Sequence, residues 1–382
     1  MRSQANNYEL QTTNYELSFR SNARTWVEID RAALRHNIGV AKKRVPHAGI
    51  IAVLKANAYG HGMEEVTKTL APHVAAFAVA SCEEALRLQQ AVSNIPIMLL
   101  SAALPCEYPT IAMHGFIPTI SSYEEAQAFA AVAPAGAPIH VKIETGMGRL
   151  GIAAAEAVEV VSKIAKLPLI IQSFSTHLPS ADSDIKSTRT QLASFEKLLP
   201  LLKKMAPQAA VHALNSAGLF RFSQYSYQLV RMGLMLYGAS PIPSFQKLLQ
   251  PALTWKARVS LIQKFSKGQS ISYGKTYVAS CDLIVAILSL GYADGYPRQL
   301  SNQGAYVLIN GRRCPLLGRV TMDQVVVDIS RAGKVSVGDE VVLLGKQGGQ
   351  EIRASWLASK ADTIAWHLFA GITERVQRCY FG

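Results

Sequence analysis

Eight apolar, strand-like runs alternate with stretches of helical periodicity between residues 50 and 237, and this alternation constrains the fold more than any other feature of the chain. Strands that are buried on both faces and separated by helices form parallel sheets. Eight such units are the number that closes a (β/α)8 barrel. The eight runs cover residues 50–56, 76–81, 95–100, 116–121, 139–145, 169–177, 211–216 and 229–237.

A different pattern follows the eighth run. Short β-type segments with tight turns dominate the rest of the chain, and Asn310-Gly311 is a strong signal for a hairpin turn. We therefore predict an α/β chain in which a TIM-like (β/α)8 barrel, residues 23–245, precedes a mostly β domain, residues 246–382. The strand-like segment at Trp26 is surplus to the eight units, and we expect it to pair elsewhere.

Hydrophobic residues make up 49% of the chain, which is enough for a large core and excludes an intrinsically disordered protein. No apolar run approaches the roughly 20 residues that a membrane-spanning helix needs. Residues 1–22 are polar, lack the apolar centre of a secretion signal, and are predicted to be a poorly ordered extension. These features predict a cytoplasmic protein with no membrane partner. The five cysteines are widely spaced and give no zinc-binding pattern, so we expect no metal.

The formal net charge is +13, which raises the question of nucleic-acid binding. The basic residues are spread along the chain, the longest uninterrupted basic run is Lys42-Lys43-Arg44, and no nucleic-acid-binding motif is present. We interpret the excess as a solvated basic surface that attracts small anions such as carboxylates and phosphates. The sequence therefore predicts a small-molecule substrate and no nucleic-acid partner.

Barrel enzymes carry their catalytic groups at the carboxyl ends of the strands, so the residues that end each run are the first candidates. The first run ends at Lys55, and Tyr59 follows in the next turn. A lysine in this place is either a solvated ammonium at a strand end or a desolvated amine with a lowered pKa that can form a Schiff base.

The fifth and sixth runs add three more candidates. Lys142 lies among apolar neighbours, and an inward-facing lysine needs a partner. A glycine-rich turn then leads to Arg149, which either presents its two-pronged guanidinium to a substrate carboxylate or pairs with a nearby acid. The sixth run ends at His177, which is either structural or orients a ring or hydroxyl group at the barrel mouth.

The last two runs favour a phosphate site, because barrels commonly build such sites from the loops after strands seven and eight. Asn215 and Ser216 follow the seventh run, and the eighth carries Arg231, Gly233 and Leu234. Small residues, hydroxyl groups and free backbone amides suit a phosphate, and a sugar phosphate fits as well as a phosphorylated cofactor. The lysine on the first strand favours pyridoxal phosphate, with Arg231 near its ring.

In their order along the chain, these motifs resemble the alanine racemases, which are fold-type III pyridoxal-phosphate enzymes built from a barrel and a β domain. The match begins at Trp26 and comprises the segments AVLKANAYGHG, ETGMGRLG, LNSAG, RMGLMLYG, ISYGKTY, GYADGYPR and GRVTMDQ. The resemblance implies an isomerase that interconverts L- and D-alanine by a two-base mechanism and supplies D-alanine for peptidoglycan. It also implies a homodimer with shared active sites.

The resemblance further assigns roles to single residues. Lys55 matches the lysine that holds pyridoxal 5'-phosphate and acts as one base, whereas Tyr273 matches the second base, which the partner subunit supplies. Lys142 matches a lysine that is often carbamylated. The implied cofactor contacts are Lys55, Tyr59, His177, Asn215, Ser216, Arg231, Gly233 and Leu234. The implied substrate contacts are Arg149, Tyr292, Met322 and Asp323.

One position departs from the family pattern, because Trp366 stands where the family usually has a phosphate-binding tyrosine. An indole N–H group donates a hydrogen bond but accepts none. A broad-specificity amino-acid racemase of the same fold is the alternative to an alanine racemase. A related decarboxylase would carry a different second-domain signature, and a non-catalytic pyridoxal-phosphate carrier would lack the β domain.

Overall fold

The computed structural model describes residues 23–382, so the extension predicted at residues 1–22 lies outside the described residues. The chain divides into two compact units. The first unit is Ala33–Gln250, which contains the parallel strands and most of the helices. The second unit combines the described residues up to Ala32 with Pro251–Gly382 and is mostly β.

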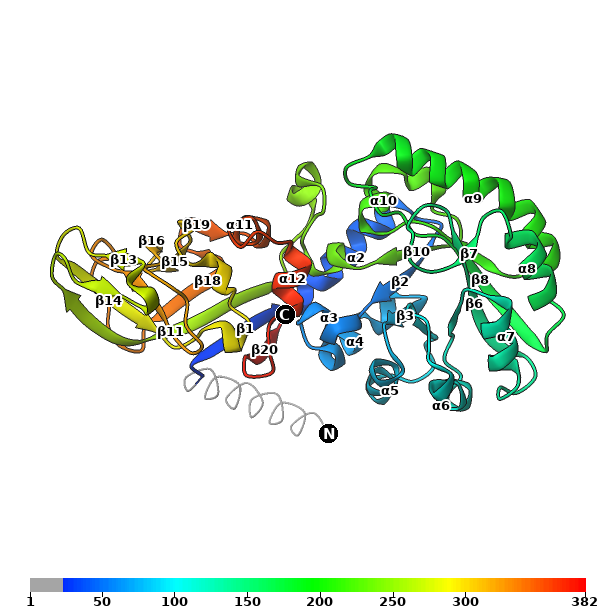
Figure 1. Cartoon of the computed structure of the whole chain (residues 1–382), viewed down its shortest axis with the longest axis horizontal. Coiled ribbons are helices and arrows are strands. Elements are labelled where there is room, and N and C mark those ends of the chain that lie inside the picture. Colours follow the sequence, from blue (N-terminus) through cyan, green and yellow to red (C-terminus); the bar gives the residue numbers. More distant parts are fainter. Residues whose placement is uncertain (1–22) are drawn as a thin grey trace, which may run out of the picture. The chain divides into compact units, whose positions relative to one another are not determined.

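The strands of the first unit form a closed parallel barrel (Figure 1). Two runs of four parallel strands, β10-β2-β3-β4 and β5-β6-β8-β9, meet at two seams. A parallel bridge joins Met98 to Ile117 at one seam, and the Arg231 N–H group donates to the Leu214 carbonyl at 3.0 Å at the other. The predicted (β/α)8 barrel is therefore confirmed. The strand bounds are β2 Gly49–Val53, β3 Ala76–Val79, β4 Ile97–Leu99, β5 Thr119–Ile120, β6 Ala137–Glu144, β8 Leu169–Ser175, β9 Ala210–His212 and β10 Leu229–Met232.

Helices lie outside these strands (Figure 1), and their apolar faces are buried against the barrel, as expected for amphipathic segments. Side chains cap several helices. Ser122 Oγ accepts the Glu125 N–H group at 3.1 Å at the start of one helix, and Ser81 Oγ accepts the Glu84 N–H group at 3.3 Å at the start of another. The main helices are α2 Arg31–Arg44, α4 Met63–Leu70, α5 Cys82–Ala91, α6 Tyr108–His114, α7 Tyr123–Ala130, α8 Ala157–Ile164, α9 Ile185–Met205 and α10 Ser216–Arg221.

The second unit contains the strand at Trp26, which corrects the predicted barrel boundary at residue 23. Strand β1, Thr25–Asp30, pairs antiparallel with β11, Leu253–Phe265, and parallel with β20, Gln377–Phe381. These hydrogen bonds agree with the prediction that the segment pairs outside the eight units, and they place it in the β unit. The other main strands are β14 Leu283–Leu288, β15 Tyr306–Ile309, β16 Arg312–Pro315, β17 Val325–Asp328, β18 Glu340–Gln347 and β19 Gln350–Ile352.

The hairpin predicted at Asn310-Gly311 is present. It joins β15 to β16, and both turn residues have a positive φ, 51° and 69°, as a two-residue type I′ turn requires. Within residues 23–382, no helix combines the length and the apolar character that a membrane span needs.

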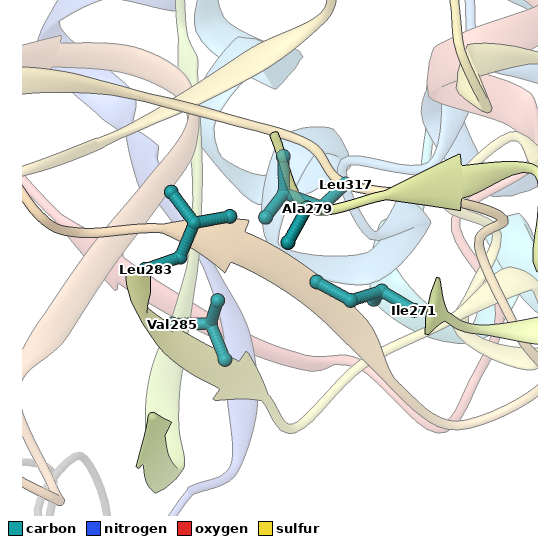
Figure 2. Close-up of a cluster of buried hydrophobic side chains, with 5 residues drawn as sticks. All are labelled: Ile271, Ala279, Leu283, Val285 and Leu317. Carbon is teal, nitrogen blue, oxygen red and sulfur yellow. The ribbon is translucent and has the colours of Figure 1, made fainter. Parts of the chain in front are cut away.

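A small apolar cluster anchors the segment that carries Tyr273 (Figure 2). The segment leaves β12, Ser270–Ile271, forms the short 3-10 turn η6, Tyr273–Lys275, and continues into β13, Tyr277–Val278. Apolar burial beneath the turn stabilises this part of the β unit, so the backbone around Tyr273 is fixed by its own unit. The buried members of the cluster are Ile271, Ala279, Leu283, Val285 and Leu317.

Candidate active site

Lys55 stands at the start of a left-handed turn. The segment α3, Lys55–Tyr59, follows directly on β2, and the four residues after the lysine have φ angles of 54°, 52°, 53° and 52°. Each non-glycine residue in this conformation costs roughly 1–2 kcal/mol, so the turn persists only because its surroundings hold it. Strain of this kind concentrates at functional sites.

Several hydrogen bonds hold the turn in place. The Asn57 side chain accepts the Met63 N–H group at 2.8 Å, and the Gly60 N–H group donates to the Ala56 carbonyl at 2.9 Å. On the other side, Glu84 Oε1 accepts the Ala56 N–H group at 2.6 Å. The sequence analysis missed Glu84, although Ser81-x-x-Glu84 has the spacing of a capping box.

Four cations gather at this end of the barrel. Burial and the nearby Arg149 lower the pKa of Lys55, with Glu84 acting in the opposite direction. Burial, followed by the charges of Arg231 and Arg149, lowers the pKa of Lys142 to about 8. The surplus of positive charge favours an anionic ligand, such as a phosphate or a carboxylate.

Arg231 is buried at the base of this cluster and is held by carbonyl groups and neutral histidines. Its guanidinium donates to the carbonyls of Thr176 at 2.7 Å and Ala213 at 2.9 Å, and it contacts Nδ1 of His212 and, at 3.3 Å, Nδ1 of His177. Burial and the Arg231 charge hold the pKa of both histidines well below the ordinary value. Burial lowers the pKa of Arg231 itself only to about 10, so it stays charged at neutral pH.

A third histidine, His140, supports this network. His140 on β6 contacts Ser173 Oγ and Ser175 Oγ, both at 2.8 Å, and its ring stacks on His212 with centroids 4.8 Å apart. Burial lowers the pKa of His140 to about 3, so it is neutral. The sequence analysis missed His140 and His212. Polar residues that alternate with apolar ones along the buried strand β6 were the available signal.

The loops after β9 and β10 form a small polar cradle with Tyr59. Ser216 Oγ accepts the N–H groups of Gly233 at 3.2 Å and Met235 at 3.3 Å, which leaves its own proton to donate. A Cβ atom at Gly233 would lie 2.9 Å from the Tyr59 hydroxyl, so a larger residue there would displace this donor. Burial raises the pKa of Tyr59 to about 12, and its hydroxyl therefore remains a donor. Such a donor set fits a phosphate group.

Two other predicted cofactor contacts lie beside the cradle. Asn215 caps α10 by accepting the Gly218 N–H group at 2.9 Å, and its amide donates to the Leu178 carbonyl at 2.8 Å. Leu234 is buried and begins the 3-10 turn η4, Leu234–Tyr237, which follows Gly233. The structure therefore brings together Tyr59, Ser216 and Gly233, with Asn215 fixing the start of the adjoining helix.

The loop that carries Arg149 is built around one carboxylate. Glu144 at the end of β6 accepts the N–H groups of Gly146 at 2.5 Å and Met147 through Oε1, and that of Arg149 at 3.4 Å through Oε2. Burial opposes ionisation of this carboxyl, but the backbone donors prevail and lower its pKa. The Arg149 side chain is exposed, which leaves its guanidinium available to a ligand.

The remaining predicted residues lie in the β unit. Tyr273 is 71% exposed and follows Ser272, whose hydroxyl donates to the Arg319 carbonyl at 2.7 Å. Tyr292 and Met322 are also exposed, and the Tyr292 N–H group donates to the Thr321 carbonyl at 3.0 Å. The loop formed by residues 319–323 therefore contacts both tyrosine-bearing turns.

Trp366 and Asp323 complete the predicted set in this unit. Trp366 is half-buried on the short helix α12, Ala365–Ala370. The Asp323 carboxylate pairs with Arg375 at 2.8 Å, and Arg375 also reaches the buried carboxylate of Asp294 at 3.3 Å. Of the two predicted bases, Lys55 lies in the barrel unit and Tyr273 lies in the β unit.

Comparison with known proteins gives matches over nearly the whole chain. Residues 29–241 match the model of the alanine racemase N-terminal domain, and residues 252–380 match that of the alanine racemase C-terminal domain. The chain is 40% identical to an alanine racemase of Methylacidiphilum infernorum, with 97% of this chain and 96% of the relative covered. It is 41% identical to one from Halothermothrix orenii, with 93% and 96% covered.

Solved structures agree with these sequence matches. An alanine racemase from D-cycloserine-producing Streptomyces lavendulae superposes with a TM-score of 0.88 at 32% identity, and 94% of this chain and 97% of that chain are covered. The Bacillus anthracis alanine racemase with bound L-Ala-P gives a TM-score of 0.87 at 32% identity, with 94% and 95% covered. The chain belongs to the alanine racemase family of pyridoxal-phosphate-dependent isomerases, which interconvert L- and D-alanine.

Proposed function

We propose that this chain interconverts L- and D-alanine with two bases, Lys55 and Tyr273, that act on opposite faces of the substrate. The observation that carries the proposal is the position of Lys55 at a barrel strand end, on a strained turn and among three further cations. Burial and the charge of Arg149 lower its pKa, so a larger fraction of its amine is free to take up a proton.

The residues at the barrel mouth fit pyridoxal 5'-phosphate. When bound, this cofactor withdraws electrons from the α-carbon of the substrate and so weakens the bond to the α-proton. Lys55 would hold its aldehyde carbon, while the donors of the polar cradle and Leu234 would hold its phosphate. Arg231 would face the ring nitrogen, and His177 lies at hydrogen-bond distance from Arg231. Because Arg231 keeps its own proton at neutral pH, it disfavours protonation of a nitrogen beside it.

The proton follows a short route in this proposal. Lys55 Nζ takes the α-proton from one enantiomer, and the Tyr273 hydroxyl returns a proton to the other face. In the reverse direction the two groups exchange roles. Arg149 would hold the substrate carboxylate through paired N–H groups, and Tyr292, Met322 and Asp323 would surround the substrate side chain.

We also propose a homodimer in which the partner subunit supplies Tyr273. Support comes from the exposure of Tyr273, Tyr292 and Met322, which are large side chains on a well-anchored surface of the β unit. Exposed apolar and aromatic groups that gather in this way are typical of interaction surfaces.

Lys142 is proposed to carry a carbamate. Its lowered pKa supplies the neutral amine that attacks carbon dioxide, with release of one proton, and the product anion would offset the nearby charges of Arg149 and Arg231. Mass spectrometry of the protein in bicarbonate should show the added mass on Lys142, and acid should remove it. An unmodified Lys142 in bicarbonate would contradict this part of the proposal.

The activity is tested by chiral analysis of products formed from a panel of L-amino acids with added pyridoxal phosphate. We expect D-alanine from L-alanine and little product from larger substrates. Comparable turnover of several amino acids would favour the broad-specificity racemase, and no racemisation of any substrate would contradict the proposal. The cytoplasmic location and the use of D-alanine in peptidoglycan stay predictions from the sequence.

Shared active sites are tested by co-expressing two differently tagged variants, Lys55→Ala and Tyr273→Phe. Each homodimer lacks one base in both sites, whereas a heterodimer has one site with both bases intact. Random association gives about half heterodimers, so the mixture should regain about a quarter of wild-type activity. If both bases came from one chain, every site would be defective, and the mixture would be no more active than the single variants.

A further inference from the structure

We infer that Glu84 is a positioning residue that fixes the backbone on the carboxyl side of Lys55 and thereby orients the lysine for catalysis. This inference rests on the proposed function of Lys55 and extends it to a residue outside the recognised motifs. The Glu84 carboxylate lies in the first turn of α5 and joins two segments that are distant in sequence.

The two carboxylate oxygens have different partners. Oε2 accepts the Ala80 N–H group at 2.8 Å and closes the start of its own helix. Oε1 accepts the Ala56 N–H group at 2.6 Å, which belongs to the lysine turn. One side chain therefore ties the residue after Lys55 to the end of β3, and hydrogen bonds to a charged acceptor are stronger than neutral ones.

The backbone is consequently held on both sides of Lys55, by strand β3 before it and by helix α5 after it. Before the lysine, the Leu54 N–H group donates to the Ala78 carbonyl on β3 at 2.8 Å. After the lysine, Ala56 is held by Glu84. Because the left-handed conformation begins at Ala56, this hydrogen bond holds the chain at the point where it enters the strained turn.

The charge of Glu84 acts on the same lysine. Burial and Arg149 lower the pKa of Lys55, whereas Glu84 raises it. A neutral side chain at residue 84 therefore changes both the orientation of Lys55 and its electrostatic surroundings. A capping residue with no link to Lys55 would change neither.

The chain contains a matched control, Glu125. Its Oε2 accepts the Ser121 N–H group at 2.7 Å, and Ser122 Oγ accepts the Glu125 N–H group, so the helix α7 begins with the same arrangement as α5. Among residues 23–382, the hydrogen bonds of Glu125 at the start of this helix stay within residues 121–125. Both glutamates therefore close the start of their own helix, but only Glu84 also accepts a hydrogen bond from the lysine turn.

The test compares Glu84→Gln with Glu125→Gln as holoenzymes. Glutamine keeps the size and one acceptor oxygen but loses the charge and opposes an amide N–H group with its own NH2 group. We expect Glu84→Gln to lower kcat for alanine on the order of 10- to 100-fold with little change in KM, the result of a misplaced catalytic amine. We expect the pH dependence of the bound-cofactor absorbance to shift in this variant. Glu125→Gln should leave both unchanged.

Unfolding curves of the two variants show whether loss of the helix cap alone explains a difference in kcat. Both variants weaken the same local bond, from the carboxylate to the N–H group four residues earlier. If Glu84→Gln fails to fold, Glu84→Asp gives the comparison, because it keeps the charge and shortens the reach to Ala56. Equal kcat values and equal absorbance profiles in the Glu84 and Glu125 variants would overturn the inference. A wild-type protein without racemase activity would contradict the proposed function, and the absorbance comparison would still decide the role of Glu84.

Discussion

In the barrel, Lys142 is 7% and Arg231 is 5% exposed, whereas in the β unit Tyr273 is 71% and Met322 is 52% exposed. The barrel residues are coupled to one another by charge and hydrogen bonds, so each depends on its neighbours for its protonation state. Tyr273 instead stands on a turn that a separate apolar cluster holds in place. Substitutions in the two regions should therefore differ in kind.

The comparison indicates how the chemistry is divided. A buried site with several cations is costly unless hydrogen bonds and an anionic ligand compensate for them, and this makes the barrel sensitive to any change of charge. An exposed phenol contributes little to the stability of its own unit. Its replacement should consequently affect catalysis without affecting folding, and the following experiments separate these effects.

The largest effect is expected for Lys55→Ala. The variant loses the group that holds the cofactor and one of the two bases, so racemisation should fall by about 10⁴-fold or more. The absorbance of pyridoxal phosphate bound to the lysine should also disappear in this variant. Measurement of both properties beside an unfolding curve distinguishes loss of chemistry from loss of fold. Unchanged turnover would remove Lys55 from the centre of the proposal.

Tyr273→Phe comes next and tests the exposed side of the comparison. Loss of one general base should lower turnover about 10²- to 10³-fold, with the effect greater for one enantiomer than for the other. Deuterium incorporation from solvent, measured from L- and from D-alanine, reports the asymmetry. The free energy of unfolding should change by less than about 0.5 kcal/mol. Equal losses from both enantiomers would argue against two bases.

A smaller effect is expected for Glu144→Gln, which weakens the loop that carries Arg149. KM for alanine should rise by about tenfold or less, the value of one charge-assisted hydrogen bond, and kcat should change less. Glu144→Asp keeps the charge and serves as the control. A rise in kcat/KM would contradict this role.

The same carboxylate makes a pH-dependent contribution to stability. Its folded-state pKa is below the ordinary value, so the stabilisation is present at neutral pH and is lost as the pH falls through the folded-state pKa. Unfolding free energies of wild type and Glu144→Gln should therefore converge on acidification below about pH 4. A difference that stays constant down to lower pH would show that the charge of Glu144 is not involved.

Leu317→Ala should have the smallest effect on turnover per folded molecule, although it removes a buried side chain beneath the Tyr273 segment (Figure 2). The cavity should lower the free energy of unfolding by about 2–4 kcal/mol. Urea unfolding measures this change, and the exposed Ile284→Ala is the control. A loss of turnover as large as that of Tyr273→Phe would show that the cluster does more than anchor the turn.

Local patterns in the sequence were sufficient for the barrel and for much of the site. The eight apolar runs predicted the eight strands because a strand buried on both faces must be apolar throughout. Asn310-Gly311 predicted its hairpin because those two residues tolerate the positive φ angles of the turn. Lys55 and Arg231 were found because they interrupt or end apolar runs.

Tertiary structure decided the features that depend on residues far apart in the chain. The strand at Trp26 joins the β unit by pairing with β11 and β20. Because these partners lie more than two hundred residues away in the sequence, no local pattern encodes the pairing. The bond from Glu84 to the lysine turn and the stacking of His140 on His212 are likewise long-range contacts. The sequence by itself thus determined the elements and the reactive residue types. Only folding decided which polar groups meet, because burial and hydrogen-bond partners are properties of the packed chain.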